Sequence, residues 1–291
     1  MSEEKAIKDF TFYTSEMEKG MKDKLFFLDF LDEHQSYNFL DYGCANGKVL
    51  EAISNVRKNQ YDVFCGYDKS SEMIQLAKSQ WQGFNINAEF ISHWPDRHVD
   101  KNKPTVLILS SVLHEIYSFY SQVFGSKAWI KEFWKEVFEA NADYIVIRDM
   151  CWSSDMDREM EGERNILRSC NGLQGYEIKS YFLPNFLRYS DVTEKQVEEF
   201  EAVWGPITNI KNFLHLLLKY RYVVNWEREV KENYFALSDK ELFSRVFNSQ
   251  YNIQYVSRFQ LPIIEKFTKL GFGNDINDNT HIKMILKRSS K

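Results

Sequence analysis

The first half of the chain repeats one unit, in which an apolar run, a tight turn and an amphipathic segment follow one another. Residues 37–43 predict a buried strand that ends in a glycine turn, and residues 48–56 predict the helix that follows this turn. The unit returns with a strand at 62–68 and a helix at 71–78. Because parallel neighbouring strands need a crossover connection, usually a helix, this alternation predicts a parallel α/β sheet.

Further segments continue the series beyond the second helix. They predict strands at 88–92, 104–110, 143–149 and 281–288, and helices at 129–138 and 261–272. The runs at 104–110 and 143–149 are almost continuously apolar, which is typical of strands that are covered on both faces. We therefore expect a doubly wound, mostly parallel sheet with right-handed crossovers.

The rhythm of strands and helices is interrupted twice, which divides the chain into three parts. Ahead of the first strand, apolar residues recur at helical spacing, so residues 1–36 predict an N-terminal helical cap. Residues 151–250 are polar, helix-biased and rich in Arg, Tyr and Trp, and they predict a large helical insertion after the fifth strand. The sheet-forming core then comprises residues 37–150 and 251–291.

Composition limits the class of protein. With 291 residues, of which 44% are hydrophobic and 27% charged, the chain has the make-up of an ordinary globular protein with one large or two modest domains. The formal net charge of -5 argues against a protein that coats nucleic acid nonspecifically. No signal-peptide-like run follows Met1, and no stretch approaches the roughly 20 apolar residues of a membrane span, so we expect a cytoplasmic protein without membrane contact.

The cysteines point to no special chemistry. Cys44, Cys65, Cys151 and Cys170 form no Cys-x-x-Cys pair. Free, partly buried thiols are therefore favoured over a disulfide or a zinc site, and the sequence predicts no metal site.

The turn after the first predicted strand reads Asp41-Tyr-Gly-Cys-Ala-Asn-Gly. Gly43 and Gly47 allow the backbone to approach a ligand closely, and the N-terminus of the next helix adds a positive partial charge. The spacing differs from the Gly-x-Gly-x-x-Gly of dinucleotide binders, which disfavours a nicotinamide-dependent dehydrogenase. A carboxylate at the end of the strand suits a cationic ammonium group better than a pyrophosphate.

This turn resembles motif I of the class I S-adenosylmethionine-dependent methyltransferases, with Ala45 in place of the frequent middle glycine. The resemblance implies a Rossmann-like core over 37–150 and 251–291 that binds S-adenosylmethionine and leaves S-adenosylhomocysteine as the product. It also implies that the motif holds the methionine part of the cofactor, through Asp41, Gly43, Cys44 and Gly47.

The second predicted strand ends at Asp68, about 27 residues after Asp41, where the family holds the acid that binds ribose. A carboxylate accepts hydrogen bonds from both ribose hydroxyls, which explains the need for an acid. The alternative for Asp68 is the N-cap of a surface helix. By the same resemblance, Lys69 and Met73 flank the adenosine.

The third predicted strand leads into Ser92-His-Trp, where many family members carry an acid that reads the adenine amino group. No acid stands at these three positions, although Asp96 is close. Position alone therefore proposes Ser92, His93 and Trp94 as the wall of the adenine site, and a surface location is an equal alternative for His93.

The segment Ser110-Ser-Val-Leu-His-Glu-Ile-Tyr follows the fourth predicted strand and resembles the family's motif IV, the loop that faces the sulfonium and the acceptor. The resemblance places Ser110 and Ser111 beside the cofactor. His114 titrates near neutrality and is the predicted general base, with Glu115 holding it or an acceptor amine. The alternative is that His114 and Glu115 simply open a helix.

A second cluster of candidate residues lies mostly in the predicted insertion. Planar and cationic side chains gather there, a mixture that suits the stacking of a base and the pairing of a phosphate. The alternative is an amphipathic helix whose charges pair with one another four residues apart. The candidate substrate-binding residues are Arg148, at the end of the fifth predicted strand, and Tyr220, Arg221, Tyr222 and Trp226.

These patterns together predict a methyltransferase that moves a methyl group from S-adenosylmethionine to an oxygen or nitrogen acceptor. We expect a small-molecule or nucleotide-like acceptor enclosed by the insertion, because the acidic total disfavours a long nucleic acid. One alternative is an RNA methyltransferase that uses the Arg and Tyr residues of the insertion. Another is a non-catalytic binding protein that keeps the methyltransferase fold. The sequence leaves the acceptor and the oligomeric state open.

Overall fold

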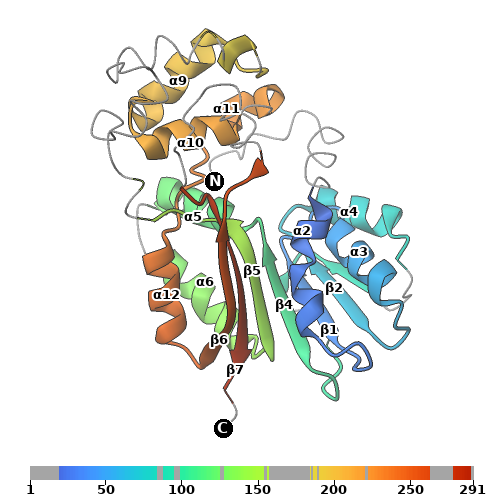
Figure 1. Ribbon diagram of the computed structural model, residues 1–291. Helices are drawn as coiled ribbons and strands as arrows, with labels where there is room; N and C mark the ends of the chain where they lie inside the picture. The colour runs from blue at the N-terminus through green and yellow to red at the C-terminus, as the bar shows by residue number, and fades with distance from the viewer. Residues whose placement is uncertain are drawn as a thin grey trace.

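A computed structural model of the protein describes residues 20–83, 88–94, 99–124, 128–153, 156, 184, 186–188, 190–219, 222–262 and 278–289. Within these residues, seven strands form one sheet in the order β3-β2-β1-β4-β5-β7-β6 (Figure 1). The strands are β1 (Asn38–Tyr42), β2 (Val63–Tyr67), β3 (Ala88–Ile91), β4 (Thr105–Ser110), β5 (Tyr144–Met150), β6 (Tyr251–Phe259) and β7 (His281–Arg288). The predicted doubly wound, mostly parallel sheet is confirmed.

Strand β1 lies in the parallel part of the sheet, between β2 and β4. Asp41 of β1 is opposite Gly66 of β2 and Ile108 of β4, so the three strands end close together at one edge. Strand β7 is antiparallel to both β5 and β6. The terminal strand predicted at 281–288 is confirmed, whereas β6, which alternates between buried or half-buried and exposed residues, was not predicted.

Helices cover both faces of the sheet (Figure 1). One face carries α2 (Met21–Lys24), η1 (Phe26–Phe30), α3 (Lys48–Arg57) and α4 (Ser71–Gln80), and the other carries α5 (Leu113–Phe124), α6 (Ala128–Glu139) and α12 (Asp239–Phe247). Alternate residues of β4 enter the two cores. Leu107 and Leu109 pack with α5 and α6, whereas Val106 and Ile108 pack with α3 and α4. This double burial explains the almost continuous apolar run at 104–110.

A group of helices between β5 and β6 lies beyond the sheet edge at which β4 and β5 end (Figure 1). We call them the cap helices: α9 (Glu194–Trp204), α10 (Ile210–Leu218), η5 (Tyr222–Asn225) and α11 (Trp226–Glu229). Helix α9 begins at a capping box made by Thr193 and Gln196. The cap helices bury their own apolar core, which includes Leu214, whereas α12 packs against the sheet through Leu242. The domain boundaries at 150 and 251 stay predictions.

The N-terminal segment is tied to the end of β5. Asp23 of α2 accepts a hydrogen bond of 3.0 Å from Nε of Arg148. Helices α2 and η1 are the described part of the predicted N-terminal cap, and the helix predicted over 261–272 lies, apart from its first two residues, outside the described residues. Across the described parts of the chain, every helix is too short or too polar to traverse a lipid bilayer.

Candidate active site

The turn between β1 and α3 is held against the end of β2 by backbone hydrogen bonds. The amides of Gly43 and Cys44 both donate to the carbonyl oxygen of Tyr67, each at 2.8 Å. Gly43 and Gly47 have φ angles of 80° and 77°, which L residues rarely adopt. Ala45, which replaces the frequent glycine of the motif, also has a positive φ of 45°. The turn is therefore tight, and α3 starts directly after Gly47.

Packing is a second reason for the glycines around this turn. A Cβ atom on Gly43 would lie 2.6 Å from Cγ2 of Val112, and one on Gly47 would lie 2.7 Å from the ring of Phe90. A Cβ atom on Gly66, at the end of β2, would lie 2.7 Å from the same ring. The fold alone thus requires these glycines, so the ligand has to be inferred from the polar side chains beside them.

Asp41 lies at the end of β1 beside the turn and is only 2% exposed. Its Oδ2 atom is buried and has no hydrogen-bond partner among the described residues. Burial raises the pKa of Asp41 to about 7, and the nearby Lys24 ammonium opposes this rise. Lys24 is buried as well, which lowers its own pKa to about 8. A buried carboxylate oxygen without a donor fits a cationic ligand group such as an ammonium.

Asp68, which follows β2, contacts the turn between β1 and α3. Its Oδ2 atom accepts a hydrogen bond from the amide of Ala45 and its Oδ1 atom accepts one from the amide of Ser70, both at 2.9 Å. Ser70 in turn caps α4 by accepting a hydrogen bond of 3.3 Å from the amide of Met73. The N-cap of α4 is therefore Ser70, and the Asp68 carboxylate links the start of this helix to the glycine turn.

The other residues predicted near the turn differ in position. The Nζ atom of Lys69 lies 4.6 Å from the centre of the Phe119 ring, so this side chain reaches from the end of β2 to α5. Met73 is 3% exposed, within the protein interior. Cys44 is buried too, and burial together with the Asp41 charge raises the pKa of its thiol well above the usual value. A neutral thiol at this place acts as a small apolar group.

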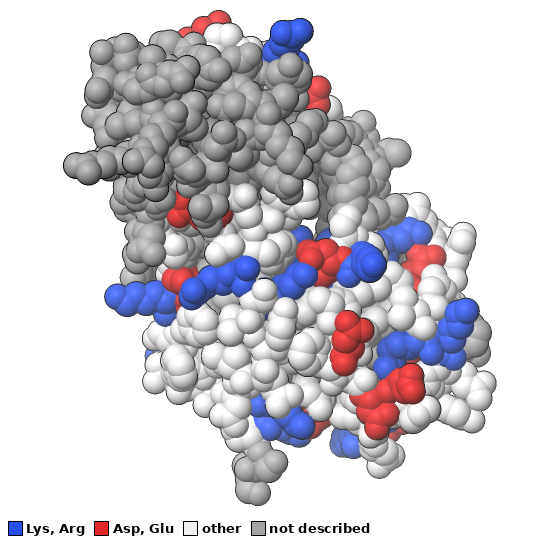
Figure 2. All heavy atoms as spheres, viewed as in Figure 1, with Lys and Arg blue, Asp and Glu red and all other residues white. Residues whose placement is uncertain are grey.

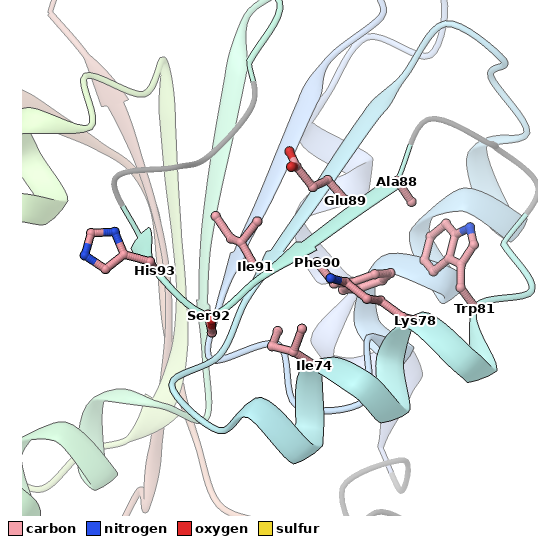
Figure 3. Close-up of a pocket in the computed structure, with 9 residues that line it drawn as sticks. All are labelled: Ile74, Lys78, Trp81, Ala88, Glu89, Phe90, Ile91, Ser92 and His93. Carbon is pink, nitrogen blue, oxygen red and sulfur yellow. The ribbon is translucent and has the colours of Figure 1, made fainter.

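A pocket of about 460 Å³ lies between α4 and β3 (Figure 3). Ser92 and His93 line this pocket, and Figure 3 shows that the His93 ring points away from α4. Trp94 is buried instead, with ring centroids 4.9 Å from Tyr42 and 5.7 Å from Tyr67. Of the three residues predicted for the adenine wall, two therefore reach the pocket and the third packs against aromatic rings at the ends of β1 and β2.

His114 lies in the first turn of α5, shortly after β4, and is buried. Its Nδ1 atom lies 2.6 Å from Oδ1 of Asp149, and its Nε2 atom lies 3.3 Å from Oε1 of Glu232. The other oxygen of Asp149 accepts hydrogen bonds from the amides of Val112 and Leu113, at 2.8 and 2.6 Å. Asp149 therefore fixes both the start of α5 and the orientation of the His114 ring.

Neither Asp149 nor Glu232 was predicted as a site residue. A signal existed for Asp149, because it is the penultimate residue of β5, the neighbour of β4, and polar residues near neighbouring strand ends meet at one sheet edge. Glu232 follows α11 in the segment that the sequence treats as one charged, helix-biased stretch. No local pattern separates Glu232 from Glu227 and Glu229, so only the tertiary fold identifies it.

The charges around His114 shift one another's pKa. Burial alone would lower the pKa of His114, but the carboxylates of Asp149 and Glu232 raise it well above its usual value. Burial would raise the pKa of Glu232, but the hydrogen bond and charge of His114 lower it to about 2. Glu115 has a raised pKa because of burial and the nearby Glu232 charge. In this arrangement His114 is an imidazolium held between two carboxylates.

Arg228, just after the start of α11, completes the cluster. Its Nη2 atom lies 3.4 Å from Oε1 of Glu115 and its Nε atom lies 3.8 Å from Oε2 of Glu232. Asn233, the residue after Glu232, donates a hydrogen bond of 2.8 Å from its backbone amide to Oγ of Ser118 in α5. The segment around α11 thus covers the start of α5 with polar contacts.

The serines after β4 and Arg148 lie at the same sheet edge. The Oγ atom of Ser110 is buried and has no hydrogen-bond partner among the described residues. Ser111 has a positive φ of 58°, and its Oγ atom accepts a hydrogen bond of 3.2 Å from Nη1 of Arg148. The same guanidinium pairs with Asp23 at 3.0 Å and lies 5.6 Å from the centre of the Phe259 ring. Arg148 therefore joins α2, β5 and the end of β6.

The residues predicted in the insertion are only partly described. Tyr220 and Arg221 lie outside the described residues. Tyr222 begins η5, and its ring centroid lies 6.5 Å from that of Tyr234. Trp226 is 6% exposed, packs in the core of the cap helices and donates a hydrogen bond of 2.8 Å to Glu199. The Trp226 ring is thus used for packing among the cap helices.

Comparison with known proteins relates the first half of the chain to one family. Residues 13–153 match the sequence profile of the family described as a methyltransferase domain. Over these residues, slightly less than half of the chain, the protein is similar to methyltransferases. The match agrees with the predicted resemblance to methyltransferases. No curated protein sequence matches the chain.

Several solved structures are similar to the chain. A candidate O-methyltransferase from Nostoc punctiforme PCC 73102 is 12% identical with a TM-score of 0.50, and the match covers 96% of this chain and 59% of that one. The plantazolicin methyltransferase BamL, in complex with a desmethylPZN analog and SAH, is 14% identical with a TM-score of 0.48, and 96% and 90% of the two chains are covered. A geranyl diphosphate C-methyltransferase from Streptomyces coelicolor A3(2) is 11% identical with a TM-score of 0.45, covering 92% and 80%. At these identities the likeness concerns the fold alone.

The residues at the ends of β1 and β4 fit the cofactor of the methyltransferase. The methionine part of S-adenosylmethionine carries an ammonium group, and the buried Oδ2 atom of Asp41 has no donor among the described residues. The buried Oγ atom of Ser110 also has none. Since buried polar atoms without partners are rare in proteins, both atoms fit a ligand that would bring matching polar groups to this edge.

Proposed function

We propose that the methyltransferase transfers the methyl group of S-adenosylmethionine to an oxygen or nitrogen atom of a small molecule that binds between the ends of β1 and β4 and the cap helices. The observation that carries this proposal is the position of His114. It lies directly after β4, the neighbour of β1 in the sheet, and faces Glu232 from the segment that follows the cap helices. An acceptor bound at this place is enclosed between the two parts.

The cofactor side of the proposed site consists of residues at the strand ends. Asp41 would bind the ammonium group, and Asp68 would accept hydrogen bonds from the ribose hydroxyls. Although Asp68 already accepts two backbone amides, each carboxylate oxygen has a further lone pair. The bound cofactor supplies an electrophilic methyl group on its sulfonium. The protein then has to place the acceptor's lone pair in line with that methyl group.

His114 would hold or accept the acceptor's proton at Nε2. Asp149 fixes the proton of the ring on Nδ1, so Nε2 is the atom that faces Glu232 and the acceptor space. While Glu232 stays in contact, the raised pKa keeps His114 protonated. An acceptor that displaces Glu232 leaves His114 paired with Asp149 alone, which lowers the pKa and frees the Nε2 lone pair for the proton.

The arrangement supports a small acceptor better than RNA. Arg228 contacts Glu115 and Glu232, and the Trp226 ring is buried among the cap helices. In the view of Figure 2, the described Lys and Arg side chains alternate with Asp and Glu side chains. A surface with both signs interspersed gives little of the phosphate attraction that RNA binding requires.

Two variants test the proposal against a surface control. His114→Asn is expected to lower the formation of S-adenosylhomocysteine by about 100-fold or more with a panel of small phenols, carboxylic acids and amines, because proton transfer contributes about 100-fold to 10,000-fold. Its affinity for S-adenosylhomocysteine, measured by calorimetry, should stay within about threefold of wild type. Asp149→Asn should lower the turnover and shift its pH profile, since the ring loses the partner of Nδ1. The control is His34→Asn, which changes an exposed histidine.

Two outcomes would contradict the proposal. Turnover by His114→Asn equal to that of His34→Asn would remove the proton-transfer role from His114. Activity on structured RNA, with a steep loss as salt is added and none on the small-molecule panel, would replace the small acceptor by a nucleic acid.

A further inference from the structure

Three side chains at the proposed acceptor site present their ligating atoms to one another. The ring nitrogen of His114 and carboxylate oxygens of Glu115 and Glu232 all lie within 4.8 Å of one another. The first two residues belong to the start of α5 and the third follows α11. Ligand atoms that share one metal ion at about 2.1 Å lie about 3 to 4 Å apart, so the cluster needs to contract by on the order of 1 Å.

Asp149 contacts one ring nitrogen of His114, as a carboxylate commonly does at a metal-binding histidine. Asp149 occupies Nδ1 at 2.6 Å, which leaves Nε2 as the only ring atom that can bind an ion, and Nε2 faces Glu232 at 3.3 Å. Histidines that bind metals usually donate their second ring N–H to a carboxylate, which orients the ring and raises its basicity. Asp149 is itself fixed by the amides of Val112 and Leu113, so the ring cannot turn freely.

The net charge of the cluster is negative, which favours the binding of a divalent cation. Asp149, Glu115 and Glu232 contribute three negative charges when ionised, and Arg228 contributes one positive charge. With His114 as an imidazolium the cluster therefore carries one negative charge, and it carries two once an ion has displaced the proton from Nε2. Arg228 contacts Oε1 of Glu115 and Oε2 of Glu232, at 3.4 and 3.8 Å, so Oε1 of Glu232 still faces the histidine. Unbalanced buried charge is costly, and a bound dication balances it.

We propose that His114, Glu115 and Glu232 bind one divalent transition-metal ion of the Mn²⁺ or Zn²⁺ type. One imidazole nitrogen with two carboxylates is a donor set that suits these ions, and three protein ligands leave coordination positions open for a substrate oxygen. This inference rests on the small acceptor and the site of the proposed function, but it changes the task of Nε2: the ion takes the place of the proton between His114 and Glu232 and holds an acceptor oxygen there, so Nε2 no longer accepts the acceptor's proton. The favoured acceptors are then those with two neighbouring oxygens, such as a catechol or a hydroxy acid.

The test measures metal binding without cofactor or acceptor. Mn²⁺ and Zn²⁺ are titrated separately into the metal-free full chain by calorimetry, and bound Mn²⁺ is also counted by electron paramagnetic resonance. We expect one ion per chain, a loss of at least tenfold in affinity in Glu115→Gln and His114→Asn, and a loss of about 10-fold to 100-fold in Asp149→Asn. Glu198→Gln, which changes an exposed acid of α9, should bind as wild type does.

Glu115→Gln is the decisive variant, because its side chain is partly exposed, at 32%, and its loss should leave the fold intact. Circular dichroism and the melting temperature confirm that intactness before the titration. The inference is overturned if the wild-type chain binds neither ion, or if Glu115→Gln binds as tightly as Glu198→Gln does. Methyl transfer that continues in excess EDTA would overturn the role of the ion while leaving the proposed function in place.

Discussion

The substitution Asp41→Asn is expected to stabilise the cofactor-free protein at pH 8 while it weakens the binding of S-adenosylmethionine. Asp41 is 2% exposed and its Oδ2 atom has no hydrogen-bond partner among the described residues. The native side chain therefore carries a buried charge that nearby Lys24 compensates in part. Asparagine has nearly the same shape without the charge.

The magnitude follows from the pKa of Asp41. Burial moves it from 3.8 to about 7. Because each pKa unit is worth about 1.4 kcal/mol, ionising Asp41 in the folded protein costs about 4 kcal/mol at pH 8. The sign is that of an acid with a raised pKa: the cost is absent below pH 3.8, grows as the pH rises and is complete above about 7. At pH 5 it is about 1.6 kcal/mol. The buried amide of asparagine gives back about 1 to 3 kcal/mol of the gain.

The assay is urea denaturation at pH 8 and pH 5 without cofactor, with Asp62→Asn as the matched control. Asp62 is an equally buried aspartate, but it accepts hydrogen bonds from Arg57 at 2.8 Å and from the amide of Tyr37 at 2.9 Å. Asp62→Asn should therefore destabilise the protein, by about 3 kcal/mol or more. Asp41→Asn should raise the free energy of unfolding at pH 8 by about 1 to 3 kcal/mol. This advantage over wild type should shrink by about 2 to 3 kcal/mol at pH 5.

Calorimetry with S-adenosylhomocysteine completes the test. The ligand's ammonium group would compensate the Asp41 charge, so Asp41→Asn should lose at least tenfold in affinity, and Asp62→Asn should retain wild-type affinity if folded. The reasoning is refuted if Asp41→Asn destabilises the protein at pH 8 as Asp62→Asn does. That result would mean that the carboxylate makes stabilising contacts in the fold and is not held there for a ligand.

Two further predictions concern packing and pH. Gly66→Ala should destabilise the protein by about 1 to 3 kcal/mol, since a Cβ atom there would lie 2.7 Å from the ring of Phe90 and 2.8 Å from Sγ of Cys44. Gly20→Ala meets no atom within 4 Å and should cost about 1 to 2 kcal/mol for its positive φ alone. Thermal unfolding measures both, and a Gly66→Ala protein as stable as wild type would contradict the packing argument. The raised pKa of His114 predicts that its stabilising contribution is fully present below pH 6.5 and is lost as the pH rises through the higher folded value. Urea denaturation of wild type and His114→Asn from pH 6 to pH 10 should show the difference in unfolding free energy shrinking, and a constant difference would count against the contact with Asp149 and Glu232.

The sheet was predictable because its strands leave local marks in the sequence. Runs covered on both faces are almost continuously apolar, and each parallel strand is followed by a turn and a helix. Strand β6 was missed because it lies at the sheet edge and alternates between covered and exposed residues in a region without other strand signals. Its alternation of Ile253 and Tyr255 with the polar residues Asn252 and Gln254 is the signal that could have identified it.

The candidate site was predictable only where it depends on local spacing. Asp41 and Asp68 lie at strand ends that the glycine turn and the strand rhythm mark in the sequence. Asp149 and Glu232 contact His114 through the fold, across neighbouring strands and from the segment after α11, and no periodicity records such contacts. Trp226 shows the converse, because it was a candidate for ligand contact beside the alternative of an amphipathic helix, and the structure buries its ring among the cap helices.

The burial of charge at the sheet edge connects the fold with the proposed reaction. Asp41 ends β1, and His114 follows β4 within a cluster of carboxylates, so both occur at the ends of paired neighbouring strands. Apolar residues of similar volume would often make such places more stable, and perturbed pKa values gather where a protein does chemistry. The buried carboxylate of Asp41 suits the ammonium group of the methyl donor. The cluster around His114 suits the proton or the ion beside the acceptor. Since β1 and β4 are adjacent, donor and acceptor bound at these places would lie side by side, as direct methyl transfer requires.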